Sequence, residues 1–140
     1  MPGRATLDSN VFIFGFERPR SNSRRILDLL AEGEMEGVVT DRVVREVMRY
    51  FRRHHGKDLA AQFRDFMLLT CELVLEADLQ IGRRLVSLVG RKDAGLLATS
   101  RAFGLAFLVS TDSDFEGVRE HRSPREFLAE LGEVPLPGDE

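Results

Sequence analysis

Phe107-Leu108-Val109-Ser110-Thr111-Asp112-Ser113-Asp114 is the stretch that decides the fold. Its first half is a short run of β-favouring residues, and its second half consists of turn-forming residues that end a strand. Near the start of the chain, Ala5-Thr6-Leu7 followed by Asp8 repeats this arrangement. Both runs are therefore predicted strands that carry an acidic residue at the carboxyl end.

Apolar residues at helical spacing, with capping residues before them and glycines after them, predict helices between the strands. After Thr40, for example, Val43, Val47 and Phe51 fall on one helical face before Gly56. Ser123-Pro124-Arg125-Glu126 combines an N-cap, a proline at the first helical position and a capping-box glutamate. Helices are predicted within residues 21–33, 40–56, 59–67, 79–90, 93–104 and 123–131, and further strands at 38–39, 71–75 and around 118–121.

Strands that alternate with helices predict an α/β fold, a three-layer α/β/α sandwich around a central and mostly parallel sheet. The 140 residues, 43% of them hydrophobic, are enough for one domain with one core. We expect this domain to span residues 1–132. Residues 133–140 contain proline and glycine and are expected to form a poorly ordered tail.

Composition excludes several classes of protein. No stretch approaches the ~20 uncharged apolar residues of a membrane-spanning helix, and the start at Met1-Pro2-Gly3-Arg4 is unlike a signal peptide. We therefore expect a soluble, cytoplasmic protein with no membrane association. The single cysteine, Cys71, cannot form an intramolecular disulfide, and three histidines without a cysteine pair offer no zinc-type spacing. The net charge of −3 hides clusters of basic residues along the chain.

Each acidic residue near a strand or helix end has a simple structural explanation when taken alone. Asp8 could cap the next helix, Asp93 could favour a helix N-terminus, and the pair Asp112 and Asp114 could stabilise a turn. Glu46 lies at helical spacing from Arg42 and Arg49, and an ordinary ion pair with either would account for it.

Together, these acids suggest more than local stabilisation. In the predicted topology, two strand ends and two helix positions lie near one place. This place is beyond the carboxyl ends of the strands, where parallel sheets bind their ligands. Clustered carboxylates repel one another unless a cation lies among them. Mg²⁺ or Mn²⁺ is the natural cation, since both prefer oxygen ligands and hold nucleic-acid phosphates in hydrolases.

Four pieces of the sequence resemble the PIN-domain ribonucleases, a family that includes the toxins, of the VapC type, of bacterial and archaeal toxin–antitoxin pairs. They agree with the family in order, spacing and local structure over nearly the whole chain. The pieces are Leu7-Asp8-Ser9-Asn10-Val11, Arg45-Glu46-Val47, Asp93-Ala94-Gly95-Leu96-Leu97-Ala98-Thr99-Ser100 and Leu108-Val109-Ser110-Thr111-Asp112-Ser113-Asp114-Phe115.

The resemblance implies a parallel sheet between helices and an acidic pocket that binds Mg²⁺ or Mn²⁺. Its principal acids, as metal ligands and catalytic residues, would be Asp8, Glu46, Asp93 and Asp112. Asp114 would be an auxiliary acid, and Asn10 and Thr111 would orient the carboxylates. The chain departs from the family pattern at Arg91-Lys92, directly before Asp93, in its poorly marked last strand, and in an arginine-dense helix after Thr40.

These features predict a metal-dependent endoribonuclease that hydrolyses RNA phosphodiester bonds without a side-chain nucleophile. One stripe of the helix after Thr40 would bind the RNA backbone, although a solvated helix face explains it equally well. A PIN fold that binds RNA or protein with weak catalysis is the main alternative, and phosphoryl transfer at Asp8 fits less well because Asn10 replaces a second aspartate. A toxin-type member would be expected to bind a small antitoxin protein and to form a homodimer. The stripe consists of Arg42, Arg45, Arg49 and Arg52.

Overall fold

The computed structural model describes residues 3–137 and contains a five-stranded sheet in which all four strand pairings are parallel. The strand order is β3-β2-β1-β4-β5, so β1 lies at the centre. This arrangement confirms the predicted α/β fold. The strands are β1 (Gly3–Leu7), β2 (Met35–Thr40), β3 (Cys71–Val74), β4 (Phe107–Val109) and β5 (His121–Arg122).

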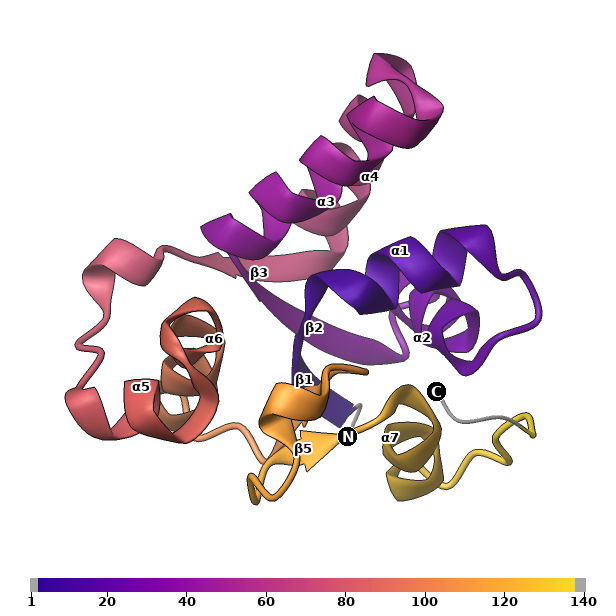
Figure 1. Cartoon of the computed structure of the whole chain (residues 1–140). Helices are drawn as coiled ribbons and strands as arrows, with labels where there is room; N and C mark the ends of the chain where they lie inside the picture. The colour runs from indigo at the N-terminus through magenta and orange to yellow at the C-terminus, as the bar shows by residue number, and fades with distance from the viewer. Residues whose placement is uncertain (1–2, 138–140) are drawn as a thin grey trace.

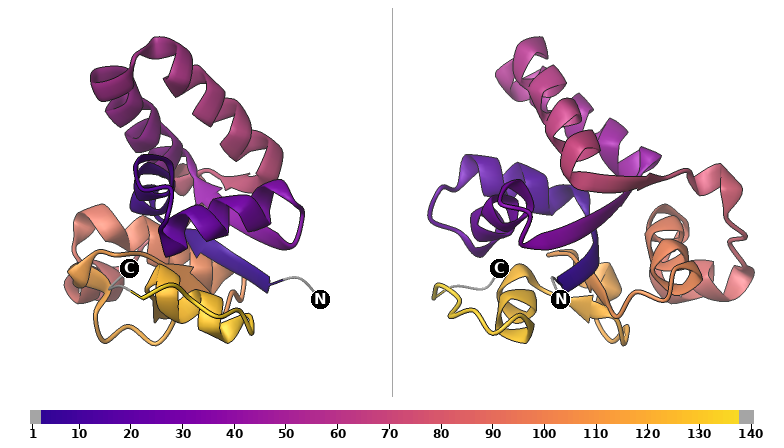
Figure 2. Two further views of the ribbon diagram at one scale, coloured as in Figure 1. Left: turned by 90° about the vertical axis from the view of Figure 1, so that its right-hand side faces the viewer. Right: turned by 180° about the vertical axis from the view of Figure 1, so that it is seen from behind.

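Helices cover both faces of the sheet (Figure 1). The pair α5 and α6 lies on one side, and α1, α2 and α7 lie on the other. Figure 2 shows α3 and α4 as a hairpin that projects away from the remaining elements. The helices are α1 (Ser9–Glu17), α2 (Asn22–Ala31), α3 (Asp41–His55), α4 (Lys57–Thr70), α5 (Arg83–Val89), α6 (Arg91–Ala102) and α7 (Pro124–Glu130), with short 3-10 turns η1 (Glu76–Asp78) and η2 (Ser113–Phe115).

The helix starts that carry capping residues lie where the sequence predicts them. The Ser21 side chain accepts a hydrogen bond from the Arg24 backbone, and Thr40 does the same for Val43. Ser123 begins α7 with a complete capping box. Each of these side chains satisfies a backbone N–H that the helix itself leaves without a partner.

Three elements differ from the prediction. Helix α5 begins at Arg83, later than predicted, because Ile81 and Leu88 are exposed and their spacing does not mark a buried face. The strand predicted around residues 118–121 forms only from residue 121, as β5 (His121–Arg122). Helix α1 forms where no element is predicted, since Val11, Phe12 and Ile13 are all buried in succession and leave no simple apolar stripe.

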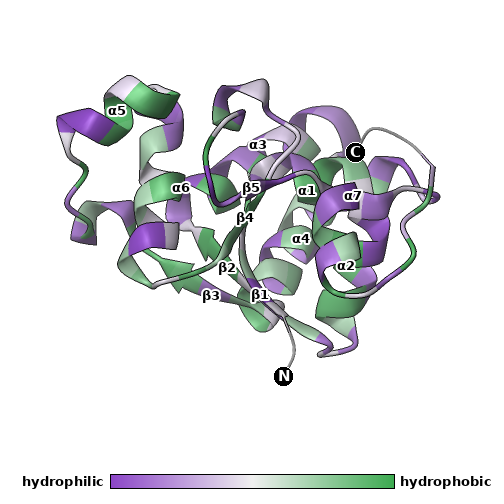
Figure 3. Cartoon of the chain, turned by 90° about the horizontal axis from the view of Figure 1, so that it is seen from below, coloured by the Kyte–Doolittle hydropathy of each residue, from purple (hydrophilic) through white to green (hydrophobic). Residues whose placement is uncertain are grey.

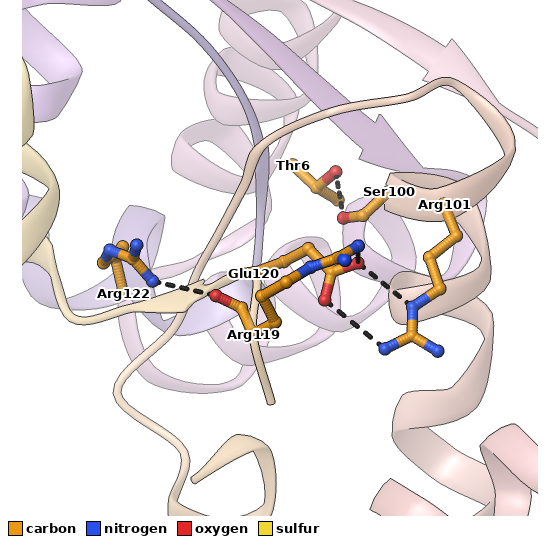
Figure 4. Close-up of polar contacts among 6 residues, drawn as sticks. All are labelled: Thr6, Ser100, Arg101, Arg119, Glu120 and Arg122. Atoms are coloured by element: carbon orange, nitrogen blue, oxygen red, sulfur yellow. Dashed lines mark hydrogen bonds and ion pairs between the residues drawn. The ribbon is translucent and has the colours of Figure 1, made fainter. Parts of the chain in front are cut away.

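The hydrophobic core takes buried residues from strands β1, β2 and β4 and from the helices on both sides of the sheet (Figure 3). Within α6, every residue from Asp93 to Ser100 is buried. The Ser100 hydroxyl donates to Thr6 Oγ1 on β1 at 2.7 Å (Figure 4). Small residues along α6 thus allow it to lie directly against the central strand.

Residues 133–137 pair with α2. Arg25 Nε donates to Glu133 at 2.8 Å, and Asn22 exchanges two hydrogen bonds with the backbone of Leu136. Residues 138–140, the end of the predicted tail, lie outside the described residues. The boundary at residue 132 stays a prediction. In the described part of the chain, no helix is both long and apolar enough to cross a membrane.

Candidate metal centre

The acidic residues gather where the strand order reverses. Strand β1 has β2 on one side and β4 on the other, and the chain leaves β1 at Asp8 and β4 at Ser110. The Asp8 backbone N–H donates to the carbonyl of Val109 at 3.0 Å, which holds these two strand ends together. Open parallel sheets bind their ligands at such a reversal point.

Asp8 is buried, with 7% of its surface exposed, and it caps α1. Its Oδ1 accepts from the Ser9 backbone at 2.7 Å, and its Oδ2 accepts from the Ser110 hydroxyl at 2.7 Å. The pKa of Asp8 is nevertheless raised, because burial and the charge of Asp112 outweigh these hydrogen bonds and the charge of Lys92. The capping role and a place in the acidic cluster therefore coexist in one residue.

Ser110 connects two of the acids and has no predicted role of its own. Its hydroxyl donates to Asp8 and also accepts from the backbone N–H of Asp112 at 2.9 Å. His121 on β5 contacts the carbonyl of Ser110 through Nε2 at 2.8 Å. The sequence does not reveal this role of Ser110, because one of its two partners, Asp8, lies 102 residues away in the chain.

Asp93 is the most constrained acid of the cluster. It is the third residue of α6, is 5% exposed, and its Oδ2 is the buried side-chain atom without a hydrogen-bond partner in residues 3–137. Burial, followed by the charges of Asp112 and Asp8 and a hydrogen bond with Asp114, raises the pKa of Asp93 to about 7. Burying an unpaired polar oxygen costs free energy unless something else binds it.

Asp93 also belongs to the tightest group of carboxylates. One oxygen from each of Asp93, Asp112 and Asp114 lies within 4.8 Å of the other two. Asp112 Oδ1 accepts from the Asp114 backbone at 2.9 Å, so the η2 turn presents both side chains together. Asp114, the predicted auxiliary acid, thus belongs to the same close group as Asp93 and Asp112.

Glu46 approaches the cluster from α3 and is half-buried. Its pKa is raised by burial and then by the charge of Asp8, while Arg42 and Lys92 act in the opposite direction. Lys92 Nζ lies 3.9 Å from Glu46 Oε2. Asp8 and Glu46 are therefore close enough to affect each other, although Glu46 lies outside the tight group of three aspartates.

The donor set suits a hard divalent cation. All of its candidate ligands are carboxylate oxygens, which Mg²⁺ and Mn²⁺ prefer, and one of them, Asp93 Oδ2, is buried without a partner. The pKa values of three acids, Asp8, Glu46 and Asp93, are raised first by burial and then by the charges of neighbouring acids. The residues thus fit a metal ion on their own chemistry.

Comparison with known families decides the classification. A family model described as PIN domain matches residues 4–114. The chain belongs to the PIN domain family. The resemblance inferred from the sequence is therefore confirmed, and the matched region contains all the predicted acids.

Solved structures with the same fold include several from toxin–antitoxin systems. A chain of a toxin–antitoxin complex from Klebsiella pneumoniae has a TM-score of 0.65 and 22% identity, over 87% of this PIN domain chain and 98% of that one. The structure of VapBC2 from Rickettsia felis, bound to a DNA fragment from its promoter, has a TM-score of 0.61 and 15% identity, over 86% of this chain and 98% of that one. VapC20 from Mycobacterium tuberculosis, a toxin that cleaves the sarcin–ricin loop, has a TM-score of 0.55 and 16% identity, over 79% of this chain and 92% of that one. A search of curated proteins finds no match.

The remaining predicted site residues lie around the acids of this PIN domain. Asn10 and Thr111 line a hollow beside Asp112, and in residues 3–137 neither side chain donates to or accepts from an acid of the cluster. Ser110 makes the orienting contacts that were expected of these two residues. A role for Asn10 and Thr111 towards substrate stays a proposal.

The arginine stripe lies on α3 beside Glu46. Arg45, Arg49 and Arg52 are exposed, and Arg42 is partly buried. Arg45 donates to Asp41 Oδ2 at 2.9 Å, so part of its charge is already compensated. The stripe is thus positioned near the acids, but one of its four members has a partner on its own helix.

Glu76 is a further acid near the cluster that the sequence analysis does not identify. Its backbone N–H donates to Asp41 Oδ1 at 3.0 Å, and its carboxylate occupies the space that a Cβ at Gly95 would need. The charge of Glu76 also contributes to the raised pKa of Glu46. Gly95 therefore makes room for a side chain from η1, whereas Ala94 and Ala98 are small, buried residues that let α6 pack closely.

Proposed function

We propose that this PIN domain is a metal-dependent endoribonuclease that uses Mg²⁺ or Mn²⁺. The observation that carries the proposal is Asp93, a buried carboxylate with an unpartnered oxygen, beside Asp112 and Asp114. Asp8 and Glu46 would complete the ligand set from β1 and α3. When bound, a divalent cation would neutralise charge that develops at the phosphate and would make water a stronger nucleophile.

The chain's own residues support this chemistry by holding oxygens in place. Ser110 fixes Asp8 and the start of the η2 turn through one hydroxyl, so two ligands from different strands keep a constant separation. Asp93 is able to act as a ligand only after it loses its proton. Exposed Arg49 and Arg52, with Arg42 and Arg45, would attract the RNA backbone, which contributes affinity but little sequence preference.

A toxin role is the finer part of the proposal. The similar structures named above come from toxin–antitoxin systems, and one is described as a toxin that cleaves RNA. We infer that this chain is a toxin of that kind, with a small antitoxin protein as its partner and a homodimer as its assembly. A short upstream reading frame that encodes a DNA-binding protein would support this role.

The decisive experiment measures cleavage of single-stranded RNA by purified protein with Mn²⁺, with Mg²⁺ and with excess chelator. Cleavage is expected only with metal. Asp8→Asn is expected to lower the rate at least a hundredfold while the thermal unfolding temperature changes little, because the amide keeps the size and most hydrogen bonds of the carboxylate. Asp58→Asn is a matched control, since Asp58 is an exposed acid in the first turn of α4.

The main alternative is a PIN fold that binds RNA or protein and has lost catalysis. It predicts that wild type and Asp8→Asn bind RNA equally and that neither cleaves it. Cleavage that is equal in wild type, Asp8→Asn and chelator would instead identify a contaminating ribonuclease. Loss of cleavage in both Asp8→Asn and the Asp58→Asn control would count against a specific role for Asp8.

A further inference from the structure

The five acids of the candidate centre divide into two groups. Asp93, Asp112 and Asp114 form the tight group, in which one oxygen from each lies within 4.8 Å of the other two. In the described part of the chain, no other set of three possible metal ligands lies so close together. Asp8, at the end of β1, and Glu46, on α3, lie beside this group. The carboxylates therefore form one position at which three of them surround a divalent cation.

Lys92 brings a positive charge to the other group of acids. It is the second residue of α6, directly before Asp93, at a point where the sequence departs from the PIN pattern. Its Nζ lies 3.9 Å from Glu46 Oε2. Its charge also lowers the pKa of Asp8 and of Asp93. The ammonium group of Lys92 is therefore close to both groups of acids.

Glu46 leaves the hydrogen-bonding capacity of Lys92 unused. The separation of 3.9 Å is too long for a hydrogen bond, and the Lys92 side chain is 64% exposed. Exposed ion pairs of this kind contribute little to stability. An ammonium group has three N–H donors, and from residue 3 to residue 137 no protein atom accepts a hydrogen bond from Lys92. Lys92 is therefore able to donate to a ligand that enters the acidic cluster.

A phosphate is the ligand that suits this arrangement. Carboxylates repel an anion, so a phosphate approaches them only where positive charge outweighs theirs. Two-metal hydrolases provide this charge with a second ion, which stabilises the reacting phosphate. A lysine is chemically able to do the same, since P-loop enzymes combine Mg²⁺ with a lysine that contacts the phosphates. Lys92 and one divalent ion would together supply two cationic groups.

We propose that Lys92 takes the place of a second metal ion and binds an oxygen of the phosphate that is cleaved. The proposal rests on the ribonuclease function proposed above and adds a catalytic residue to its acids. In this reaction the oxygen of a water molecule forms a bond to phosphorus, and the bond from phosphorus to one ribose oxygen breaks. The proton that the water loses is balanced by the proton that the ribose oxygen gains. Lys92 keeps its own protons and only donates hydrogen bonds.

Cleavage and metal binding are expected to change in opposite directions in Lys92→Met. Because the substitution removes a donor to the reacting phosphate, kcat for single-stranded RNA with saturating Mn²⁺ should fall about a hundredfold. The affinity for Mn²⁺, measured by electron paramagnetic resonance, should stay equal or rise, because a competing positive charge is gone. A fall in both quantities would overturn the proposal, since Lys92 would then only support the structure of the metal site.

Two further variants separate the charge of Lys92 from its position. Lys92→Arg keeps a cationic donor, so its kcat should stay within about tenfold of wild type. Arg91→Met removes the same charge from the adjacent position, which lines a separate hollow, and should change kcat by no more than about twofold. Equal kcat values in Lys92→Met and Arg91→Met would overturn a specific contact between Lys92 and the phosphate.

The arrangement of bound metal is an independent readout. Electron paramagnetic resonance of the wild-type protein with Mn²⁺ and inorganic phosphate is expected to show isolated Mn²⁺ ions. Two ions that share a site lie about 3.5–4 Å apart, and their electron spins would couple. A coupled spectrum in the wild-type protein would overturn the proposal, because a second ion would then occupy the place assigned to Lys92.

RNA binding without metal distinguishes this proposal from the ribonuclease proposal. In Asp8→Asn protein with excess chelator, Lys92→Met should weaken the binding of labelled single-stranded RNA several-fold, and Arg91→Met should leave it within about twofold, as measured by fluorescence anisotropy. If this difference appears in a protein that never cleaves RNA, Lys92 remains a phosphate contact and the nuclease fails. If wild type and Lys92→Met cleave RNA equally well, the nuclease remains and the role of Lys92 fails.

Discussion

At the scale of single residues, Asp93 links the acidic cluster to pH. Its pKa of about 7 lies above the ordinary value of 3.8, so the folded chain holds this proton more tightly than the unfolded chain does. The contribution of Asp93 to stability is therefore present at low pH and falls as pH rises from about 4 to about 7. At higher pH the folded chain holds a buried, charged Asp93 among other carboxylates, and this lowers the free energy of unfolding.

Asp93→Asn tests this link in metal-free protein. The variant is expected to unfold a few degrees higher than wild type at about pH 8, where Asp93 is charged, and at nearly the same temperature at about pH 5, where Asp93 is neutral. Thermal unfolding in excess chelator measures both differences. Equal shifts at the two pH values would mean that the titration of Asp93 does not account for the difference, and Asp58→Asn, at an exposed position on α4, serves as the control.

Lys92 is a second residue with a measurable electrostatic role. Its ammonium group lies 3.9 Å from Glu46 Oε2, and its charge lowers the pKa of Asp8, Glu46 and Asp93. Removal of this charge is expected to strengthen Mn²⁺ binding several-fold at low ionic strength, with a smaller effect in high salt. Titration of Lys92→Met with Mn²⁺, followed by electron paramagnetic resonance, measures the change.

Arg91→Met provides the control for Lys92. The Arg91→Met substitution removes the same charge from the adjacent position. Arg91, however, lines a separate hollow with Ile81 and Val86. Its effect on Mn²⁺ affinity is expected to be clearly smaller. Identical effects of the two variants would show that only the overall charge of this region matters.

At the scale of elements, an ion pair between exposed Arg101 and buried Glu120 links the end of α6 to the segment before β5 (Figure 4). Glu120 is 3% exposed and accepts from Arg101 at 3.0 and 3.4 Å. Burial raises the pKa of Glu120, but the hydrogen bond and charge of Arg101 outweigh burial and hold it below its ordinary value. The pair therefore stabilises the fold above acidic pH and loses this effect as Glu120 becomes protonated.

Glu120→Gln is expected to lower the free energy of unfolding by about 1 kcal/mol, because the buried side chain then accepts a hydrogen bond from the more exposed Arg101 with a neutral amide in place of a carboxylate. Urea denaturation near neutral pH measures the difference. Arg119, which is 87% exposed and also contacts Glu120, provides the comparison. Arg119→Gln should cost less than about 0.5 kcal/mol, as is usual for an exposed pair.

Elements with local signals were predictable from the sequence, and those with only tertiary causes were not. Caps at Ser21, Thr40 and Ser123 act within one turn, so each is visible in a few letters. Helix α1 is defined by burial from several sides, and the start of α5 is not marked by any apolar face. The burial that decides such segments comes from residues far away in the sequence.

The acidic site shows the same division. Asp8 and Asp112 follow recognisable strands, and Asp93 opens a recognisable helix. The contacts of Ser110 and Glu76 join segments that the sequence keeps apart, so neither residue could be assigned in advance.

At the scale of the whole molecule, metal binding and folding should be coupled. The candidate ligands come from β1, α3, α6 and η2, so only the folded chain presents them together. At Mn²⁺ concentrations about a hundredfold above Kd, binding to the folded state alone contributes about 2.7 kcal/mol, which corresponds to a rise of roughly 10 °C in Tm. Excess chelator should reverse this rise.

Asp93→Asn should abolish most of the Mn²⁺-dependent rise, while Asp58→Asn should retain it. A rise of equal size in Asp93→Asn would mean that Mn²⁺ binds elsewhere on the protein. Ca²⁺ gives a further comparison, since it also binds carboxylates but demands a larger and more flexible site.

The position of β4 between β1 and β5 has a consequence for synthesis in the cell. The central strand β1 is made first, yet its neighbour β4 and the η2 turn that carries Asp112 and Asp114 come more than a hundred residues later. A ribosome that has translated the chain only as far as about residue 100 therefore holds a chain without a complete metal pocket. If the proposed activity is harmful to the cell, the danger begins only after the η2 turn has been made.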